Sequence, residues 1–292
     1  MRALTLEAPA KINLSLAVTG RRPDGYHELA GVMALIDLTD TLTLTPGCSG
    51  LRVNAPPADA IPVSRAENLA WRGLVAGAGG DPEIACLTLE KRIPVGAGLG
   101  GGSSDAASAW RLGRRMSRQA EIPTGAELTG ELAAIGADVP FFAAMYPAAY
   151  VTGIGEHVRP IASRPAYVVL ALPRFRLSTA AVFAELRTSD WSPAAPSVDA
   201  APGSNDLLAP ASRLKPELQD LLRDMAAVGA EPRLSGSGPC CFALTDDPDR
   251  AAAVLAAMTG RGVRTMQSRL LTAAYQVTEL SADHETEDHD DA

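Results

Sequence analysis

A chain of 292 residues that is 47% apolar can bury two hydrophobic cores, which favours two domains over one. Aromatic residues make up only 4%, too few for a surface that stacks the bases of a long nucleic acid. The net charge of −8 comes mostly from Asp283–Ala292, without whose six acids the chain holds 28 acidic and 26 basic residues. A nearly neutral body offers no basic face, so we expect neither nucleic acid nor a membrane as a partner.

The targeting and cysteine patterns predict a cytoplasmic protein with reduced thiols. No run of 18 apolar residues occurs, and Met1–Pro9 contains Glu7 and lacks the apolar core of a signal peptide. The four cysteines have no C-x-x-C spacing and indicate no zinc site; they are Cys48, Cys86, Cys240 and Cys241. We interpret 281–292 as a disordered acidic tail, because it has almost no apolar surface to bury.

The first clear element is a strand at Ala10–Thr19, where apolar and polar residues alternate. Ile12 and Leu14 fall on one face, and Lys11 and Asn13 fall on the other. Lys11 is one of three lysines in a chain with 23 arginines. Two interpretations of the polar face stay open: a solvated surface, or an ammonium and a carboxamide held side by side above a site.

A turn-rich loop, Gly20–Leu29, then places Tyr26 beside His27. An aromatic ring next to an imidazole can stack on a flat ligand ring and hydrogen-bond to it. Ser64 and Glu67 form a capping box, which predicts a helix that runs through Trp71 to Val75. Strands are expected at Val32–Leu38, Thr41–Thr45 and Ile84–Leu89.

The strand at 84–89 leads into Pro94–Ala107, where five of the seven positions from Gly96 to Gly102 are glycine. Glycine lets a backbone approach a ligand closely, and the helix that follows directs N–H groups and its positive dipole end at one spot. The pattern favours phosphate binding, and the hydroxyls of Ser103 and Ser104 are available to a metal ion. A flexible loop before a capped helix is the other interpretation.

Other phosphate-binding motifs fit this stretch less well. A Walker loop needs Lys and then Ser or Thr after its last glycine, but Gly101 is followed by Gly102. The fragment Gly96–Gly101 satisfies G-x-G-x-x-G, yet Glu121 lies between helical patterns at 111–119 and 126–135 and not at the end of a second parallel strand. The His-Arg-Asp and Asp-Phe-Gly motifs of protein kinases do not occur.

A helix expected at Ala126–Ile135 leads to Asp138, which precedes Pro140 where a helix N-cap would stand. A structural cap and a catalytic base are both consistent with this residue. Strands around Tyr150–Val158 follow, and we interpret the proline-punctuated stretch Arg159–Pro165 as the domain junction.

The second half of the chain predicts antiparallel strands with helices on one face. Leu234–Cys240 is a second glycine turn, without the G-x-S-x-G spacing of hydrolases, and a second donor-rich turn would complete a phosphate cradle. The expected strands are Ala166–Leu172, two within Arg233–Leu244, and Leu270–Glu279; the expected helices are Thr179–Leu186, Pro216–Val228 and Pro248–Met258.

Three separated blocks, Pro9–Leu14, Pro94–Ala107 and Leu234–Cys240, resemble the three motifs of the GHMP small-molecule kinases. Together with Pro9–Leu14, the blocks Arg21–Leu29 and Gly136–Phe142 resemble the members that phosphorylate 4-diphosphocytidyl-2-C-methyl-D-erythritol in the non-mevalonate route to isoprenoid precursors. The resemblance runs from about Glu7 to Glu279. It implies an α+β fold with a ribosomal-protein-S5-domain-2-like domain at 1–160, a ferredoxin-like domain at 161–280, and the active site in the cleft between them.

The same resemblance implies roles for individual residues. Asp138 would accept the proton of the substrate's 2-hydroxyl as it attacks the γ-phosphorus of ATP, and Lys11 would hold Asp138 ionised and neutralise charge on the transferred group. His27 would read the cytosine edge, while Tyr26 stacks with Phe183 on the other side. The implied ATP-binding residues are Asn68, near the adenine, and Pro94, Val95, Gly96, Ala97, Gly98, Leu99, Gly100, Gly101, Gly102, Ser103 and Ser104. The implied substrate-binding residues are Asn13, Tyr26, His27, Ser178, Thr179, Phe183, Gly236, Ser237 and Gly238.

Mg²⁺ is expected with ATP, but no acidic ligand for it stands out, and we expect a monomer or weak homodimer acting on a small molecule. Two rival functions stay open. Another GHMP kinase, for a mevalonate-type acid or a sugar, would share the glycine loop but lack the Pro-Asp-Gly-Tyr-His block. A nucleotide-binding module without enzymatic activity would need neither Lys11 nor Asp138.

Overall fold

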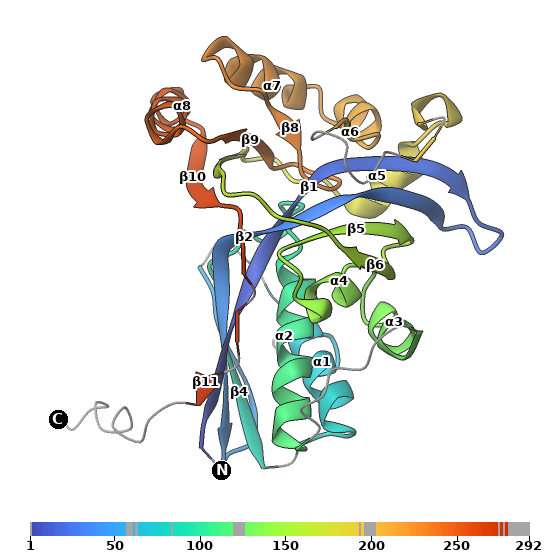
Figure 1. Ribbon diagram of the computed structural model, residues 1–292, viewed down its shortest axis with the longest axis vertical. Coiled ribbons are helices and arrows are strands. Elements are labelled where there is room, and N and C mark those ends of the chain that lie inside the picture. The colour runs from blue at the N-terminus through green and yellow to red at the C-terminus, as the bar shows by residue number, and fades with distance from the viewer. Residues whose placement is uncertain are drawn as a thin grey trace.

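A computed structural model describes residues 2–56, 61, 64–82, 84–118, 126–192, 194–195, 203–273, 275–276 and 278–279, with the side chains of 126–129 and 279 left aside. The expected tail at 281–292 and Glu121 lie outside these residues. The described chain forms two β-sheets with helices packed on them, which confirms the expected α+β class (Figure 1). The domain limits near residue 160 stay a prediction.

The first sheet is organised by one long antiparallel hairpin. β1 (Leu4–Arg21) pairs with β2 (His27–Pro46) from Leu4 opposite Leu44 to Arg21 opposite His27. β4 (Ala85–Glu90) pairs antiparallel with β2 and parallel with β3 (Gly50–Asn54). β5 (Ala148–Gly153) joins β2 and β6 (His157–Pro160), and β11 (Thr278–Glu279) pairs with β1. In Figure 1 the β1–β2 ribbon rises from the lower sheet and bends over below the upper one.

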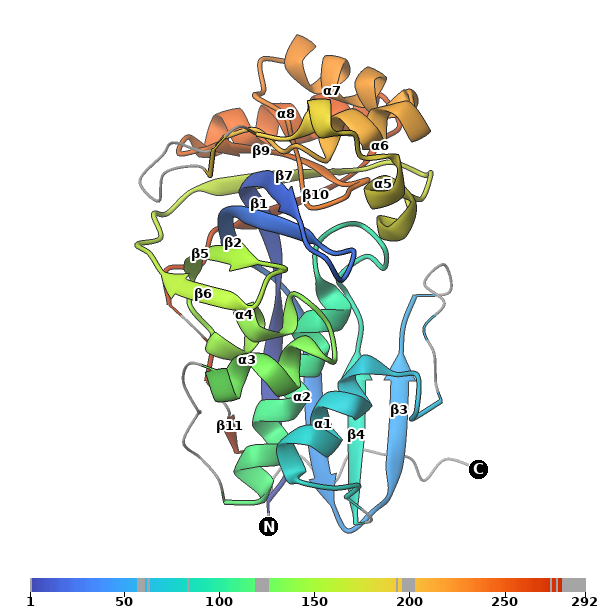
Figure 2. The same ribbon diagram turned by 90° about the vertical axis from the view of Figure 1, so that its right-hand side faces the viewer.

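Four helices cover one face of this sheet: α1 (Leu69–Ala78), α2 (Gly101–Met116), α3 (Ala126–Ala133) and α4 (Val139–Ala144) (Figure 2). Leu42 and Leu87 of the sheet pack with Trp71 and Leu112 of the helices. A second cluster joins Leu35 to the α2 and α4 side chains Ala106, Trp110 and Phe141. The apolar stripe expected on α2 is therefore the face that fixes α2 against the sheet.

The second sheet is antiparallel throughout, as the second half of the sequence predicts. Its strand order is β10 (Arg264–Arg269), β7 (Tyr167–Leu172), β9 (Cys241–Thr245) and β8 (Arg233–Leu234). The helices of this half are α5 (Thr179–Glu185), η1 (Thr188–Asp190), α6 (Leu208–Leu214), α7 (Glu217–Ala227) and α8 (Pro248–Gly260). Val169 and Ala243 of the sheet share a core with Met225 and Val254 of α7 and α8.

Several elements differ from the sequence expectations. The strands expected at Val32–Leu38 and Thr41–Thr45 are one strand, β2, because β1 pairs with both parts of it, with a shift of register between Pro9 and Ala10. The strand expected at Leu270–Glu279 is replaced by β10, which ends at Arg269, and the two-residue β11. β3 and α6 were not expected.

The helix after Ser64 begins later than the capping box predicts. Asn68, not Ser64, is the N-cap of α1, and its Oδ1 accepts the N–H groups of Ala70 and Trp71 at 3.0 and 3.3 Å. Ser64 instead starts a turn, in which its carbonyl accepts the N–H groups of Glu67 and Asn68.

The two sheets meet through an apolar cluster that includes part of the glycine stretch. Ile12 of β1 lies with Leu170 and Phe242 of the second sheet, and with Ala97 and Leu99. Ala97 and Leu99 thus fix the glycine stretch at the junction of the two sheets.

The expectation of four reduced thiols is wrong for one pair. Cys48 and Cys86 are joined as a disulfide with their Cα atoms 5.3 Å apart, because the end of β2 brings Cys48 next to the start of β4. Cys240 and Cys241 are free and buried, as expected. Within the described residues, no helix has the length and apolar character to cross a membrane.

Candidate active site

A cleft of about 940 Å³ opens where the two sheets meet. Its walls are Lys11 and Asn13 of β1, the tip of the β1–β2 hairpin, the glycine stretch, the start of α4, and α5. Two segments more than 130 residues apart, the glycine stretch and the turn after β8, form its floor together. The cleft is therefore lined by parts of all three blocks that resemble the GHMP kinase motifs.

The glycine stretch turns into helix earlier than its sequence indicates, since α2 begins at Gly101. Gly100 is its N-cap in the left-handed conformation, with φ +72°, and has no side chain to cap the helix. A Cβ on Gly98, which has φ +80°, would stand 2.3 Å from the carbonyl oxygen of Ser235. The N–H groups of the first helical turn are thus left to a ligand, and this arrangement suits a phosphate.

The second glycine turn packs directly on the first. The Ser235 hydroxyl donates to the carbonyl of Gly98 at 3.0 Å, and the N–H of Cys240 donates to the carbonyl of Ala97 at 3.1 Å. Asn205 holds the turn from the other side, because its side-chain amide donates to the carbonyls of Leu234 and Gly236 at 2.9 and 2.8 Å. The expected pairing of two glycine turns is confirmed, and Asn205 is a supporting residue that no sequence pattern indicated.

Lys11 and Asp138 lie together in the cleft. Lys11 Nζ stands 3.7 Å from Asp138 Oδ2 and donates to Asn13 Oδ1 at 2.5 Å. The Lys11 side chain is 5% exposed, so the interpretation of a solvated strand face is wrong. Its backbone N–H donates to the carbonyl of Leu99 at 2.9 Å, which ties β1 to the glycine stretch.

The structure also separates the two interpretations of Asp138. The residue occupies the N-cap position of α4, but its side chain makes no capping hydrogen bond. Its carboxylate is instead 27% exposed and faces the cleft beside Lys11. The structure therefore does not support the cap interpretation, and the role of Asp138 as a catalytic base stays a prediction.

A buried cluster of three ionisable side chains lies next to the glycine stretch. Lys91 Nζ contacts Asp40 Oδ2 and Asp105 Oδ2, the latter at 2.7 Å, and Asp40 also accepts the N–H groups of Arg92 and Ile93. Burial raises the pKa of Asp105 to about 8, although Lys91 opposes this shift. Burial alone would lower the pKa of Lys91, but the two carboxylates raise it. The cluster fixes both ends of the glycine stretch, and Asp105 Oδ1 has no hydrogen-bond partner among the described residues.

The aromatic wall differs in detail from the expectation. His27 itself stacks on Phe183, with ring centroids 5.5 Å apart, and meets Trp191 edge-on at 6.0 Å, while Tyr26 is 61% exposed. Burial, and then the charge of Arg21, lower the pKa of His27. A neutral imidazole has one donor and one acceptor nitrogen, which suits the edge of a heterocyclic base.

Most residues that the sequence selected line the cleft, and three do not. Ser104 donates its hydroxyl to the carbonyl of Pro9 at 2.6 Å and is fully buried, because it anchors α2 to β1. Ser178 is the N-cap of α5, and Gly238 lies against Leu234 behind the turn. The predicted residues that do line the cleft are Lys11, Asn13, Tyr26, His27, Asn68, Pro94, Val95, Gly96, Ala97, Gly98, Leu99, Gly100, Gly101, Gly102, Ser103, Asp138, Thr179, Phe183, Gly236 and Ser237.

Other cleft residues were missed by the sequence analysis. Arg21, Glu67, Lys91 and Asp105 line it. Lys91, one of the three lysines, lies three residues before Pro94, where the glycine stretch begins, and that position was the available signal. Arg21 belongs to the turn-rich loop Gly20–Leu29, in which only Tyr26 and His27 have side chains typical of a binding site for a flat ring.

The donor groups fit ATP better than they define a metal site. The glycine cradle has the left-handed backbone and close contacts that exclude any side chain, as a phosphate loop requires. Among the described residues, no group of three or more His, Cys, Asp or Glu side chains is placed to hold a metal ion. In kinases, Mg²⁺ is bound by phosphate oxygens, water and one or two carboxylates. The described cleft residues therefore do not identify which side chain would bind it.

Comparison with known proteins agrees with this geometry. The model of the GHMP kinase N-terminal domain matches residues 68–145, and that of the GHMP kinase C-terminal region matches residues 182–264. A homoserine kinase structure from Cytophaga hutchinsonii, 15% identical with a TM-score of 0.64 over 95% of this chain and 98% of that chain, shows the shared fold.

Two curated relatives and one solved structure that are more similar to this chain are named as the same kinase. The chain is 40% identical to 4-diphosphocytidyl-2-C-methyl-D-erythritol kinase of Thermus thermophilus, over 87% of this chain and 92% of that protein. It is 38% identical to the protein of the same name from Bradyrhizobium diazoefficiens, with the same coverage. A crystal structure of 4-(cytidine 5'-diphospho)-2C-methyl-D-erythritol kinase superposes with a TM-score of 0.76 at 36% identity, over 91% of this chain and 98% of that one. The chain belongs to the 4-diphosphocytidyl-2-C-methyl-D-erythritol kinase family of the GHMP kinases.

Proposed function

We propose that this chain transfers the γ-phosphoryl group of ATP to the 2-hydroxyl of 4-diphosphocytidyl-2-C-methyl-D-erythritol. The observation that carries the proposal is the position of Asp138, which stands in the cleft beside Lys11 with no capping bond. Family membership supports the choice of substrate.

The proposed reaction needs one proton acceptor and a set of positive groups. Asp138 takes the proton of the 2-hydroxyl as its oxygen bonds to the γ-phosphorus, the bond from that phosphorus to the bridging oxygen of ATP breaks, and ADP leaves. The N–H groups at the start of α2 hold the phosphates, and the ammonium of Lys11 balances charge on the transferred group. Mg²⁺, when bound to ATP, would add further neutralisation of the phosphates.

Further residues would bind and orient the two substrates. Asn13 accepts a hydrogen bond from Lys11 and so orients the ammonium. His27 would read the cytosine edge from its place against Phe183. Asn68 also lines the cleft, and the adenine is proposed to lie near it. The Thr179 hydroxyl is 2.9 Å from that of Ser237, which links α5 to the second glycine turn across the substrate.

The rival functions fit the geometry less well. A mevalonate-type acid or a sugar has no flat base, so the wall of His27 and Phe183 would serve no purpose. A nucleotide-binding module without activity does not need a buried lysine aimed at an aspartate. Cytoplasmic location and a monomeric or weakly dimeric state stay predictions.

A coupled assay of ADP release across the erythritol derivative, mevalonate and hexoses tests the proposal. Phosphorus NMR of the product should show a new monoester beside an intact diphosphate. ADP release with mevalonate or a hexose alone would refute the choice of substrate. An assay with no ADP release from any alcohol would favour the binding module.

A further inference from the structure

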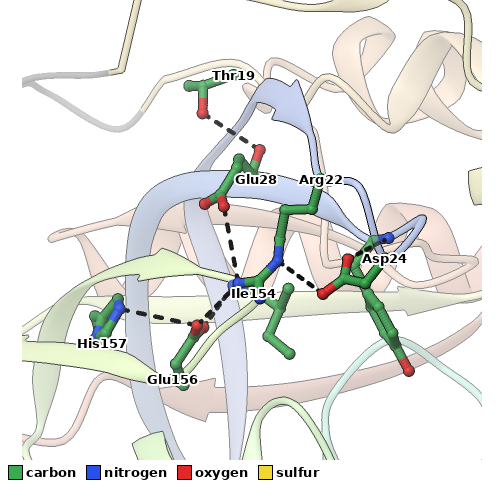
Figure 3. Close-up of polar contacts among 8 residues, drawn as sticks. Thr19, Arg22, Asp24, Glu28, Ile154, Glu156 and His157 are labelled. Carbon is green, nitrogen blue, oxygen red and sulfur yellow. Dashed lines mark hydrogen bonds and ion pairs between the residues drawn. The ribbon is translucent and has the colours of Figure 1, made fainter.

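Two consecutive arginines, Arg21 and Arg22, stand at the tip of the β1–β2 hairpin with very different surroundings. Arg22 Nε is 3.0 Å from Asp24, and its Nη1 is 3.8 Å from Glu28 and 3.5 Å from Glu156. Figure 3 shows Arg22 among these carboxylates, with Glu156 coming from the turn between β5 and β6. Arg22 is thus fully engaged in fixing the hairpin tip to the rest of the first sheet.

Arg21 faces the cleft instead. It lies directly opposite His27 in the β1–β2 register, and both side chains line the cleft. Cross-strand partners have their Cβ atoms about 5 Å apart, which explains why the charge of Arg21 lowers the pKa of His27. Among the described residues, no carboxylate lies within ion-pair distance of Arg21.

The other cationic side chains of the cleft are already engaged. Lys11 is 3.7 Å from Asp138, and Lys91 contacts both Asp40 and Asp105. Among the lysines and arginines that the structure places in the cleft lining, Arg21 alone has no carboxylate partner. An unneutralised guanidinium beside a neutral imidazole is suited to an anion attached to a heterocyclic base.

We propose that Arg21 binds the diphosphate of the cytidine-diphosphate-linked substrate, an inference that rests on the proposed function. A diphosphate diester carries two negative charges, and it follows the nucleoside that His27 would hold. The N–H groups of the glycine stretch are taken by the phosphates of ATP, so the second substrate needs a cation of its own. Arg21 makes the cleft select a nucleoside diphosphate over the bare nucleoside.

Calorimetric titration with two probes, cytidine 5'-diphosphate and cytidine, tests this role. The titrations are made with a non-hydrolysable ATP analogue saturating the glycine stretch, so that the diphosphate cannot bind there. Arg21→Gln should weaken the binding of cytidine diphosphate about 3- to 10-fold, the range for a charge-assisted hydrogen bond that solvent partly screens, and leave that of cytidine unchanged. Arg21→Lys keeps the charge without the planar fork and should retain part of the advantage.

Arg52→Gln is the matched control, because Arg52 is an exposed arginine on β3 that does not line the cleft. It should bind both probes as the unmodified protein does. In steady state, Arg21→Gln should raise KM for the cytidine substrate and leave kcat and KM for ATP unchanged.

Four outcomes would overturn the inference. The first is that Arg21→Gln binds cytidine diphosphate as tightly as the unmodified protein does. The second is that Arg21→Gln weakens the binding of both probes equally, which would mean that Arg21 acts through His27. An equal loss in Arg52→Gln would mean that the overall charge matters and not the position. If the unmodified protein binds neither probe, the proposed function fails, and the inference fails with it.

Discussion

Removing the carboxylate of Asp138 should abolish turnover without loosening α4. Asp247, at the N-cap of α8, provides the matched control, since its Oδ1 accepts the N–H groups of Asp249 and Arg250 at 2.9 and 3.3 Å. The two residues are the same type at the same helical position, but only Asp247 makes capping hydrogen bonds. Substitution of each by Ala and by Asn therefore separates a cap from a base.

The expected stability changes follow from these contacts. Asp247→Ala loses its capping bonds and should lower the free energy of unfolding by about 1 kcal/mol, within the 0.5–2 kcal/mol range measured for caps. Asp138→Ala loses no capping bond. Its pair with Lys11 is 3.7 Å long and partly exposed, and Lys11 keeps its bond to Asn13, so the expected loss is below about 1 kcal/mol.

The expected kinetics are the reverse. Positioned bases contribute about 10²- to 10⁴-fold, so kcat of Asp138→Asn should fall by at least the lower factor, with little change in KM for either substrate. Asp247→Ala should keep its kcat. Lys11→Met acts on the same step, so the double variant Lys11→Met with Asp138→Asn should be far less impaired than the product of the two single effects.

Steady-state kinetics and thermal melts of these variants decide between the two roles. An Asp138→Asn enzyme with more than half its normal kcat would remove Asp138 from the proton transfer. Transfer would then depend on the positioning of phosphates by the start of α2 alone. A loss of stability in Asp138→Ala equal to that in Asp247→Ala would restore the cap interpretation.

Three further predictions address the glycine stretch, the cysteines and the buried charges. Gly98→Ala should lower the melting temperature of the ligand-free protein far more than Gly96→Ala. A Cβ at position 98 would stand 2.3 Å from the Ser235 carbonyl oxygen, whereas a Cβ at position 96 meets nothing within 4 Å. Equal shifts in melting temperature would show that the positive φ alone matters. Thiol titration of the denatured, unreduced protein should count two thiols, and a count of four would exclude the disulfide. Replacing Cys48 and Cys86 by Ser should lower the free energy of unfolding by about 3–4 kcal/mol, the value for a loop of this length. The pKa of Asp105 is raised from 3.8 to about 8 in the folded protein. Between these two pH values the folded protein holds a proton that the unfolded chain has lost, so the free energy of unfolding falls as pH rises through this window. Asp105→Asn cannot lose a proton, so its melting temperature should gain on that of the unmodified protein between about pH 4 and pH 8. A constant difference over this range would contradict the raised pKa.

The sequence predicted those parts of the fold that depend on short-range patterns. The alternation at Ala10–Thr19, the glycine stretch before α2 and the antiparallel second half are all present. Long-range pairing decided the rest. β2 is continuous because β1 pairs with both parts of it, and β10 and β11 take their positions from β7 and β1.

Cap positions were also beyond the reach of the sequence alone. Ser64 with Glu67 matches a capping box as well as many true helix starts do, but Asn68 is four residues nearer to the helix and satisfies its first N–H groups. At α4 the reverse applies, since Asp138 has the right type and position for a cap and does not act as one. Residue type and spacing are the same in both roles, so only the direction of the side chain distinguishes them.

The pairing of Lys11 with Asp138 shows most clearly what a local pattern leaves undecided. Period-two alternation places Lys11 and Asn13 on the same face of β1, but it does not say what covers that face. The cover comes from Gly100, the turn at Gly236, and Asp138, which the chain supplies from three distant segments. The bond to Asn13 compensates the buried ammonium, and the same packing places Lys11 beside the base that it would serve.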